Sequence, residues 1–413
     1  MTTAALVNCG KYVFVRNYWP MLTGPELVHF RKNLLAWFKK FQRGLPWRRT
    51  SDPYAIWLSE IMLQQTRVAA VLPYFERFLQ HFPTIEALAK APEDDVLRLW
   101  AGLGYYSRAR NLQSAARQIV ALHHGEFPSD EAHTLALSGI GNYTTAAVLS
   151  IAFGKKLAVL DGNVARVLAR LGAIRGDLRS GNRWTKLQEM ANELLDRKHP
   201  GNWNQAMMEL GATLCTPRAP QCLLCPVSEV CEARKEGIID LIPEKRKKRD
   251  TVQVQLAAIV LVDRKARTLL LPPPNTAARM PASKEDVPAL LSRMWHFPTI
   301  QLSDPANSQR KGSGRTTRSA KEGVTGIAAK ELQQFVEAEY LSGRKLPSGP
   351  LPLKHVRHAV TYRAITLFPF LLKVPKLPRV AGARVLPLAD PGSVPISNLT
   401  RKVARSALLE LSL

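Results

Sequence analysis

The chain of 413 residues carries 58 Lys and Arg against 33 Asp and Glu, a formal net charge of +25 at pH 7. Its apolar fraction of 46% is enough for packed cores, and its length predicts two domains. No apolar run reaches transmembrane length and the N-terminus lacks a signal-peptide pattern, so a soluble, cytoplasmic protein that binds nucleic acid is favoured over one on an acidic membrane surface.

Residues 1–25 carry no motif and are treated as an N-terminal extension. A helix is predicted over 26–41, where apolar residues recur at helical spacing: Leu27, Phe30, Leu34, Leu35, Phe38 and Phe41. The segment 43–49 interrupts this pattern. Within it, Trp47 is either a buried plug behind a turn or, with neighbouring arginines, part of the mouth of a base pocket.

A second helix is predicted over 53–65, and Glu60 lies beside its apolar stripe. No basic residue stands three or four positions from Glu60, where a helical ion pair would need one. Apolar surroundings raise the pKa of a carboxyl, so we expect a raised pKa at Glu60. The alternative interpretation is a solvated surface glutamate.

From 68 to 124 the pattern is helix after helix, with short breaks predicted at Pro73, Pro83, Pro92 and Gly102. Further helices are predicted over 164–172, 184–197 and 204–215. No convincing strand precedes residue 251, so the first 240 residues are predicted to be all-α.

The turn that begins at Gly102 carries Tyr105 and Tyr106 and is followed by Arg108 and Arg110. Aromatic and basic side chains that alternate on a turn are typical of contacts with a nucleic-acid backbone and with a stacked or wedged base. We also expect at least one of the two tyrosines to pack in the core.

The stretch 137–166 joins a Gly-x-Gly turn, a helix and an extended return. Gly139 and Gly141 leave backbone N–H groups at the start of a helix predicted over 143–153, which is a ready site for a phosphate. Gly154 stands where the C-cap of that helix belongs. That helix rises roughly 18 Å, and the extended segment 157–160 covers much of the way back. We therefore expect Asp161 to lie close to the turn.

Four of the five cysteines fall within 17 residues, in the spacing C-x6-C-x2-C-x5-C: Cys215, Cys222, Cys225 and Cys231. So short a span favours a compact inorganic centre over a disulfide framework. Structural zinc usually uses two C-x2-C pairs separated by a longer loop, so this spacing favours a [4Fe–4S] cluster, with zinc as the alternative. Cys9 stands apart and is expected to be an ordinary cysteine.

A linker with the basic run 245–249 is predicted over 243–251. Beyond it the pattern becomes rich in β-branched and apolar residues, and strands are predicted over 252–262, 269–271 and 364–374. The segment 303–326 is rich in Ser, Gly, Lys and Arg and is predicted to be a disordered insertion.

Together these motifs resemble those of the MutY-type adenine DNA glycosylases, members of the endonuclease III, or helix-hairpin-helix, superfamily. The resemblance covers roughly residues 26–235. It is carried by the four cysteines and by SEIMLQQTR (59–67), GLGYYSRARNL (102–112), LSGIGNYTTA (137–146), VLDGNVARVLAR (159–170) and NQAMMELGA (204–212).

The resemblance implies an all-α helix-hairpin-helix glycosylase barrel with an iron–sulfur cluster domain over 26–242, its cluster loop at 215–231. An α/β Nudix-like domain over 252–413 is implied to follow, and WHFP (295–298) is similar to that domain's Trp-x-Phe-Pro signature. The implied activity, in base excision repair, hydrolyses the N-glycosidic bond of adenine mispaired with 8-oxoguanine or guanine. The implied enzyme is a monomer that acts on double-stranded DNA.

Residue by residue, the resemblance makes Glu60 the general acid and Asp161 the carboxylate that stabilises the sugar cation. Its place just before a helix start is expected to keep Asp161 ionised. Asn163 and Tyr143 match positions that hold the sugar side of the site. Positions near the adenine match Arg43, Leu45, Trp47, Arg48 and Glu209. Positions that wedge beside the 8-oxoguanine match Gln65 and Tyr105.

Tyr143 and the segment 360–362 distinguish this chain. Superfamily members that also cut the strand carry a lysine where this chain has Tyr143, which cannot form an imine, so a monofunctional glycosylase is predicted. The family's reader loop usually carries Phe-Ser-His, whereas Val360, Thr361 and Tyr362 stand here. Thr361 keeps the hydroxyl of the family's serine, whereas Tyr362 replaces the family's histidine. The alternatives are a thymine or endonuclease III-like glycosylase, or a DNA-binding relative without catalysis.

Overall fold

The computed structural model describes residues 22–244, 250–273, 294–302, 318–340, 349–360 and 362–412. Cys9, Thr361 and the basic run 245–249 lie outside the described residues. The chain forms two compact units: one comprises described residues of 1–57, 128–136 and 140–246, the other those of 58–127, 137–139 and 247–413. None of the described helices is both long and apolar enough to cross a lipid bilayer.

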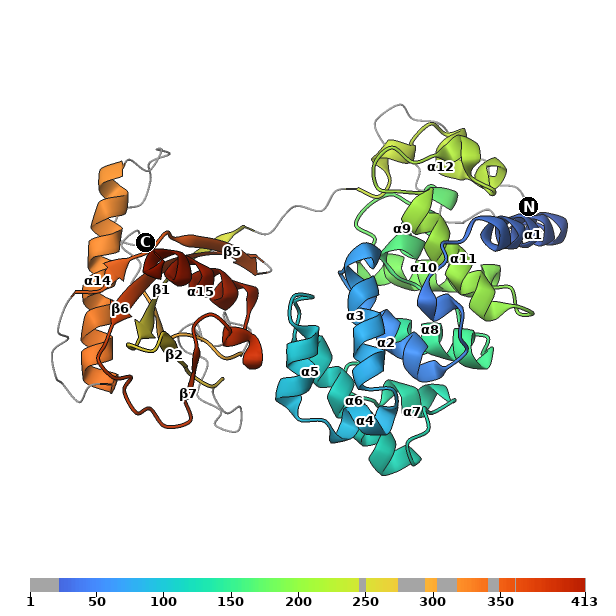
Figure 1. Cartoon of the computed structure of the whole chain (residues 1–413). Coiled ribbons are helices and arrows are strands. Elements are labelled where there is room, and N and C mark those ends of the chain that lie inside the picture. Colours follow the sequence, from blue (N-terminus) through green and yellow to red (C-terminus); the bar gives the residue numbers. More distant parts are fainter. Residues whose placement is uncertain are drawn as a thin grey trace. The chain divides into compact units, whose positions relative to one another are not determined.

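The first unit is helical (Figure 1). Its helices are α1 (Gly24–Phe41), α7 (Glu131–Leu135), α8 (Asn142–Phe153), α9 (Gly162–Leu171), α10 (Gly181–Leu194), α11 (Pro200–Thr213) and α12 (Glu232–Lys235). Short 3-10 turns lie at Pro46–Arg48, Cys222–Leu224, Ser228–Val230 and Ile239–Leu241.

The predicted apolar face of α1 is confirmed at its centre. Phe30, Leu34 and Phe38 are buried in the first unit's core, where the Phe30 ring lies 5.5 Å from the ring of Trp203 on α11. The prediction is wrong for Phe41, which is 60% exposed. Phe41 ends the helix, and the ammonium of Lys40 lies 5.2 Å from its ring, so this ring serves as a surface contact.

Helix α2 (Pro53–Leu63) begins in the first unit and continues into the second. There it is followed by α3 (Val68–His81), α4 (Ile85–Lys90), α5 (Glu93–Trp100) and α6 (Ser107–His123). The breaks predicted at Pro83, Pro92 and Gly102 are confirmed.

The break predicted at Pro73 is wrong, because Pro73 lies inside α3. Proline removes one helical hydrogen bond but can be tolerated where packing holds the turn. Here Val71, Phe75 and Phe78 are buried on one face of α3, and the Phe78 ring meets the Trp100 ring edge-on at 5.9 Å. Tertiary packing therefore outweighs the local signal.

The chain from residue 250 onward forms a seven-stranded mixed sheet in the order β4-β6-β1-β2-β7, with β3 paired to β1 and β5 paired to β6. The long strands β1 and β6 are parallel, and the other pairs are antiparallel. The strands are β1 (Val252–Val262), β2 (Arg267–Leu270), β3 (Thr299–Gln301), β4 (Leu351–Pro352), β5 (Val356–Val360), β6 (Arg363–Lys373) and β7 (Arg384–Pro387). The predicted strand-rich region is confirmed, and no described residue before 251 lies in a strand.

One helix covers each face of this sheet, so β1 is buried on both sides (Figure 1). Ala257, Ile259 and Leu261 pack with the face of α14 (Arg318–Tyr340) formed by Ala328, Leu332 and Val336. The alternate residues of β1 pack with α15 (Asn398–Leu411). The predicted α/β character of this part therefore holds, as a mixed sheet between two helices.

The disordered insertion predicted over 303–326 is wrong for residues 318–326, which lie in α14. The remaining residues, 303–317, lie outside the described part of the chain. Composition alone missed the helix start, because the apolar face that anchors α14 lies downstream at Ala328, Leu332 and Val336.

Candidate active site and nucleic-acid interface

The Gly-x-Gly turn of the sequence lies directly before α8, as predicted. Gly139 has a φ of +75°, and a Cβ there would lie 2.6 Å from the Cβ of Asn111. A left-handed backbone and a close neighbour both require glycine at this position. Gly141 is the extended N-cap of α8, and left-handed Gly154 ends the helix, also as predicted.

Asp161 is the N-cap of α9. Its carboxylate accepts hydrogen bonds from the backbone N–H of Val164 at 2.7 Å and from Nδ2 of Asn163 at 3.1 Å. The sequence predicted that the helix start would keep this group ionised. Both hydrogen bonds act in that direction, but burial is the larger effect and raises the pKa of Asp161 above its usual range.

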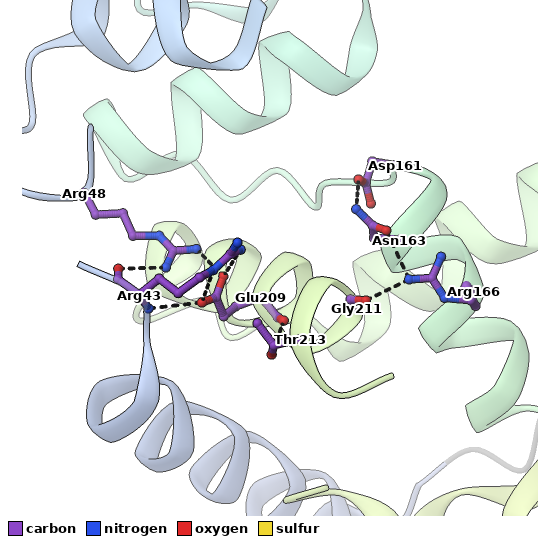
Figure 2. A network of polar contacts seen from close by, with 8 residues as sticks. All are labelled: Arg43, Arg48, Asp161, Asn163, Arg166, Glu209, Gly211 and Thr213. Atoms are coloured by element: carbon purple, nitrogen blue, oxygen red, sulfur yellow. Dashed lines mark hydrogen bonds and ion pairs between the residues drawn. The ribbon is translucent and has the colours of Figure 1, made fainter. Parts of the chain in front are cut away.

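A polar chain extends from Asp161 through Asn163 to Arg166 (Figure 2). Nη2 of Arg166 donates to Oδ1 of Asn163 at 3.0 Å and to the Gly211 carbonyl at 2.7 Å, and its Nε donates to the Cys215 carbonyl at 2.9 Å. Sequence reasoning missed Arg166. The available signal was its position three residues after Asn163 on the same helix.

Tyr143 lies in the first turn of α8, and its hydroxyl contacts Sδ of Met208 at 3.5 Å. Met208 belongs to α11, the helix that also carries Glu209. Tyr143 and Glu209 therefore lie in the same unit, although their segments are far apart in the sequence.

Glu209 is a buried carboxylate held by two arginines (Figure 2). Arg43 donates to it through Nε at 2.8 Å, Nη2 at 2.6 Å and its backbone N–H at 3.0 Å, and Arg48 donates through Nη2 at 2.8 Å. These bonds outweigh burial and lower the pKa of Glu209 to about 2. Leu45 and Trp47, between the arginines, are both 6% exposed, as the buried interpretation of Trp47 expected.

Glu60 is 5% exposed and lies on α2, where every residue from Tyr54 to Met62 is buried. A helix buried on all sides offers no solvated face. The alternative of a solvated surface glutamate is therefore wrong, because Glu60 is buried.

Gln65 and Tyr105 occupy two turns of the second unit and share an unusual backbone. Gln65 has a φ of +57° and Tyr105 a φ of +49°, a left-handed conformation that costs a non-glycine residue roughly 1–2 kcal/mol. Both side chains are exposed, Tyr105 by 45%. The neighbouring Tyr106 is buried, which confirms that one of the two tyrosines packs in the core.

The two arginines after this turn are less available to DNA than the sequence suggested. Arg108 is 9% exposed, and its guanidinium donates to backbone carbonyls of the second unit. Arg110 donates to Glu93 at 2.8 Å. Charge pattern alone did not reveal these intramolecular partners.

Cys215, Cys222, Cys225 and Cys231 line one cavity, whose wall also includes Arg170. Burial raises the pKa of Cys225 to about 12 and also raises that of Cys231. Nη1 of Arg170 lies 3.3 Å from Sγ of Cys215. The thiols of Cys225 and Cys231 therefore need nearby positive charge to become thiolates, which fits a cationic centre. As they stand, no three His, Cys, Asp or Glu among the described residues are arranged to hold a metal ion.

In the C-terminal part, β5 and β6 pair up to Val360 opposite Arg363, so Tyr362 lies where the hairpin turns. Tyr362 is 38% exposed and lies under the guanidinium of Arg363, 4.6 Å from the ring centre. Thr361, the residue before Tyr362, lies outside the described residues. Trp295 and Phe297 of the WHFP motif are buried in the sheet's core.

Residues 58–197 match the family described as HhH-GPD superfamily base excision DNA repair protein. The adenine DNA glycosylase of Homo sapiens is 36% identical over 375 residues, a match that covers 81% of this chain and 64% of the human protein. The adenine DNA glycosylase of Rattus norvegicus is 45% identical over 231 residues, a match that covers 53% of this chain and 45% of the rat protein. A solved thermostable thymine-DNA glycosylase shares 30% identity at a TM-score of 0.47, covering 51% of this chain and 97% of that one.

The chain spans less than two thirds of the length of these two curated relatives. The match to the human protein covers 81% of the chain, so it continues beyond the helical part, which ends near residue 244, into the sheet. The family match and the two curated relatives confirm the resemblance to adenine DNA glycosylases of the helix-hairpin-helix superfamily that the motifs predicted.

Proposed function

We propose that this chain, whose residues 58–197 match the helix-hairpin-helix base excision repair superfamily, is an adenine DNA glycosylase. It hydrolyses the N-glycosidic bond of adenine mispaired with 8-oxoguanine or guanine in double-stranded DNA. The observation that carries the proposal is the setting of two carboxyls, buried Glu60 and the partly desolvated N-cap Asp161, in a chain similar to adenine DNA glycosylases over 81% of its length.

Glu60 acts as the general acid. Adenine is a poor leaving group unless its ring is protonated, and a carboxyl delivers that proton most effectively when its environment keeps it partly protonated. The burial of Glu60 within the run 54–62 of α2 supports this role.

Asp161 stabilises the sugar cation that remains once the base departs. The hydrogen bonds from Val164 and Asn163 fix the carboxylate in one orientation. Burial removes water from it, and a desolvated anion attracts a developing positive charge more strongly than a hydrated one. Asn163 is itself held by Arg166, which keeps the amide beside the carboxylate.

The extruded adenine is bound by Arg43, Leu45, Trp47, Arg48 and Glu209. Base extrusion is required because the glycosidic bond is out of reach in the stacked duplex. The ion pairs of Glu209 with both arginines support a preorganised pocket, since they fix donor directions before the base arrives.

The glycosylase is monofunctional. An imine intermediate needs an amine nucleophile, and Tyr143 supplies a hydroxyl instead. Its contact with Met208 supports a role in shaping the sugar side of the site.

DNA is held by phosphate contacts and by a wedge. The net charge of +25 suits a polyanion, and the turn at Gly139 and Gly141 offers backbone N–H groups to a phosphate. Exposed Gln65 and Tyr105 wedge beside the base opposite the adenine.

The four cysteines hold a [4Fe–4S] cluster, for which the shared cavity and the buried thiols give support. The bound cluster supplies the cross-link that keeps the loop 215–231 folded. All four cysteines would then be ligands as thiolates, and Arg170 beside Cys215 would balance part of their charge.

The domain organisation follows the resemblance. Residues 26–242 form the glycosylase barrel and its cluster loop, 243–251 the linker, and 252–413 a Nudix-like domain that reads 8-oxoguanine through Thr361 and Tyr362. The protein works as a monomer in the cytoplasm, on the nucleoid. If Thr361 makes one hydrogen bond to 8-oxoguanine, Thr361→Ala should lower the preference for that opposite base about fivefold, about 1 kcal/mol.

The test is a panel of duplexes containing adenine opposite 8-oxoguanine, adenine opposite guanine, and thymine opposite guanine. The parent should release adenine from the first two. Glu60→Gln and Asp161→Asn should each slow release at least about hundredfold while duplex affinity stays largely unchanged.

The matched controls are Glu126→Gln and Asp240→Asn, which make the same chemical changes at exposed positions and should leave the rate unchanged. Release of thymine in place of adenine would assign the chain to a different glycosylase activity. Parent-like rates in either carboxyl variant would refute the roles given to Glu60 and Asp161.

A further inference from the structure

The guanidinium of Arg108 joins two turns of the second unit. From α6 it donates to the carbonyls of Ile61 at 2.8 Å and Met62 at 3.0 Å, and to that of Gln64. It also donates to the hydroxyl of Thr66 at 3.2 Å. These groups form the C-terminal end of α2 and the turn after it, where helix carbonyls lack partners of their own and carry partial negative charge.

The same guanidinium reaches the second turn. Nη2 donates to the carbonyl of Gly104 at 3.3 Å, and the guanidinium carbon lies 5.3 Å from the centre of the Tyr105 ring. The Gly104 carbonyl also accepts a hydrogen bond from Nε1 of Trp100 at 3.2 Å. Each turn is thus anchored to one rigid, planar group.

Both turns need such an anchor. Gln65 stands between Gln64 and Thr66, the two residues that Arg108 holds, and Tyr105 directly follows Gly104. Gln65 and Tyr105 both adopt positive φ, a conformation that a non-glycine residue keeps only when its surroundings enforce it. Without the anchor, either turn would relax and carry its exposed side chain to a new direction.

Arg108 is also poorly suited to contact DNA itself. It is 9% exposed, and all five of its hydrogen-bond acceptors are neutral oxygens of the protein. Burial lowers the pKa of Arg108 to about 10, so the group stays charged at neutral pH. The positive charge of Arg108 therefore interacts with oxygen atoms inside the second unit.

We propose that Arg108 is a positioning residue that locks the turns of Gln65 and Tyr105 into one rigid probe for the base opposite the adenine. The inference rests on the proposed function, because it names what sets the specificity of that site. Lysine cannot replace Arg108, since a single ammonium lacks the planar fork that reaches both turns.

The experiment measures single-turnover adenine release from duplexes with adenine opposite 8-oxoguanine and opposite guanine, and takes the ratio of the two rates. Arg108→Lys should lower this ratio about tenfold, about 1.4 kcal/mol. In a Gln65→Ala/Tyr105→Ala background the same substitution should change the ratio less than about twofold, because the residues through which it acts are gone.

The matched control is Gln113→Leu. Gln113 is another buried polar residue of α6, and it donates to the carbonyls of Leu88 at 3.2 Å and Ala91 at 2.7 Å. Its loss should lower thermal stability and leave the ratio unchanged. If Arg108→Lys is not folded at the assay temperature, Thr66→Val decides, since it removes one of the five bonds and should still lower the ratio.

An unchanged ratio in the folded Arg108→Lys or Thr66→Val protein would overturn the inference while leaving the proposed function intact. An equal fall in the parent and in the Gln65→Ala/Tyr105→Ala background would also overturn it, because Arg108 would then act by another route. A parent that releases no adenine from either duplex would refute the proposed function itself.

Discussion

Replacing Glu209 by glutamine removes the charge at the centre of the first unit's ion-pair network and keeps the side chain's size. The Glu209 side chain is fully buried, and the Arg48 side chain is only 10% exposed. Removing one partner of a buried pair leaves the other charge uncompensated, which is strongly destabilising. We therefore expect Glu209→Gln to lower the free energy of unfolding.

The size of the effect follows from the pKa of Glu209, which falls from 4.5 to about 2 on folding. Since each pKa unit corresponds to about 1.4 kcal/mol, the ionised carboxylate contributes roughly 3 kcal/mol at pH 7. A lowered pKa gives stability that is present above pH 4.5 and is lost as the pH falls towards 2. At pH 4, below the ordinary pKa of a glutamate, the contribution has begun to fall.

The assay is urea unfolding of parent and Glu209→Gln at both pH values, followed by circular dichroism of the helices. The difference between the two proteins should be about 3 kcal/mol at pH 7 and smaller at pH 4. Glu93→Gln is the matched control, because Glu93 pairs with Arg110 while 49% exposed and should cost less than about 1 kcal/mol. A loss at Glu209 no larger than this, or one that does not vary with pH, would refute the reasoning.

Three further predictions concern the cluster, the Gly-x-Gly turn and the reaction product. Cys225→Ser should abolish the yellow-brown visible absorption expected of anaerobically purified protein and lower its iron content; stoichiometric zinc without iron in the parent would contradict the cluster. Gly139→Ala should destabilise the protein by roughly 1–2 kcal/mol, because Gly139 has a φ of +75° and a Cβ there would lie 2.6 Å from Asn111. Gly141→Ala should be near neutral in thermal melts, because a Cβ at Gly141 would have no atom within 4 Å. Reaction products should be intact abasic strands until treated with base, and borohydride trapping at the level of true lyases would contradict the assignment of Tyr143.

Much of the secondary structure could be predicted, because its signals are local. The apolar spacing of 26–41 gave α1, Gly154 marked the end of α8, and strand β1 was predicted with its observed bounds. The errors arose where a distant contact outweighed the local signal. Pro73 stays helical because of packing around α3, and α14 starts earlier than composition suggested.

The candidate site divides in the same way. Residue type and motif spacing determined which residues to consider: a glutamate on an apolar helix, an aspartate at a helix start, and four cysteines within 17 residues. Residue spacing could not show that burial raises the pKa of Asp161 or that Glu209 has its pKa lowered. Those shifts depend on solvent exclusion and on neighbouring charges.

The sequence by itself determined the helices and strands and the motifs that relate this chain to adenine DNA glycosylases, since both are written in neighbouring residues. Only the tertiary structure decided which cationic side chains bond to groups within the protein itself. Arg43 meets Glu209 across 166 residues, and Arg108 meets the carbonyl of Ile61 across 47. A guanidinium looks the same in sequence whether it faces a phosphate or a buried carbonyl, and only packing brings one of these partners within hydrogen-bond distance.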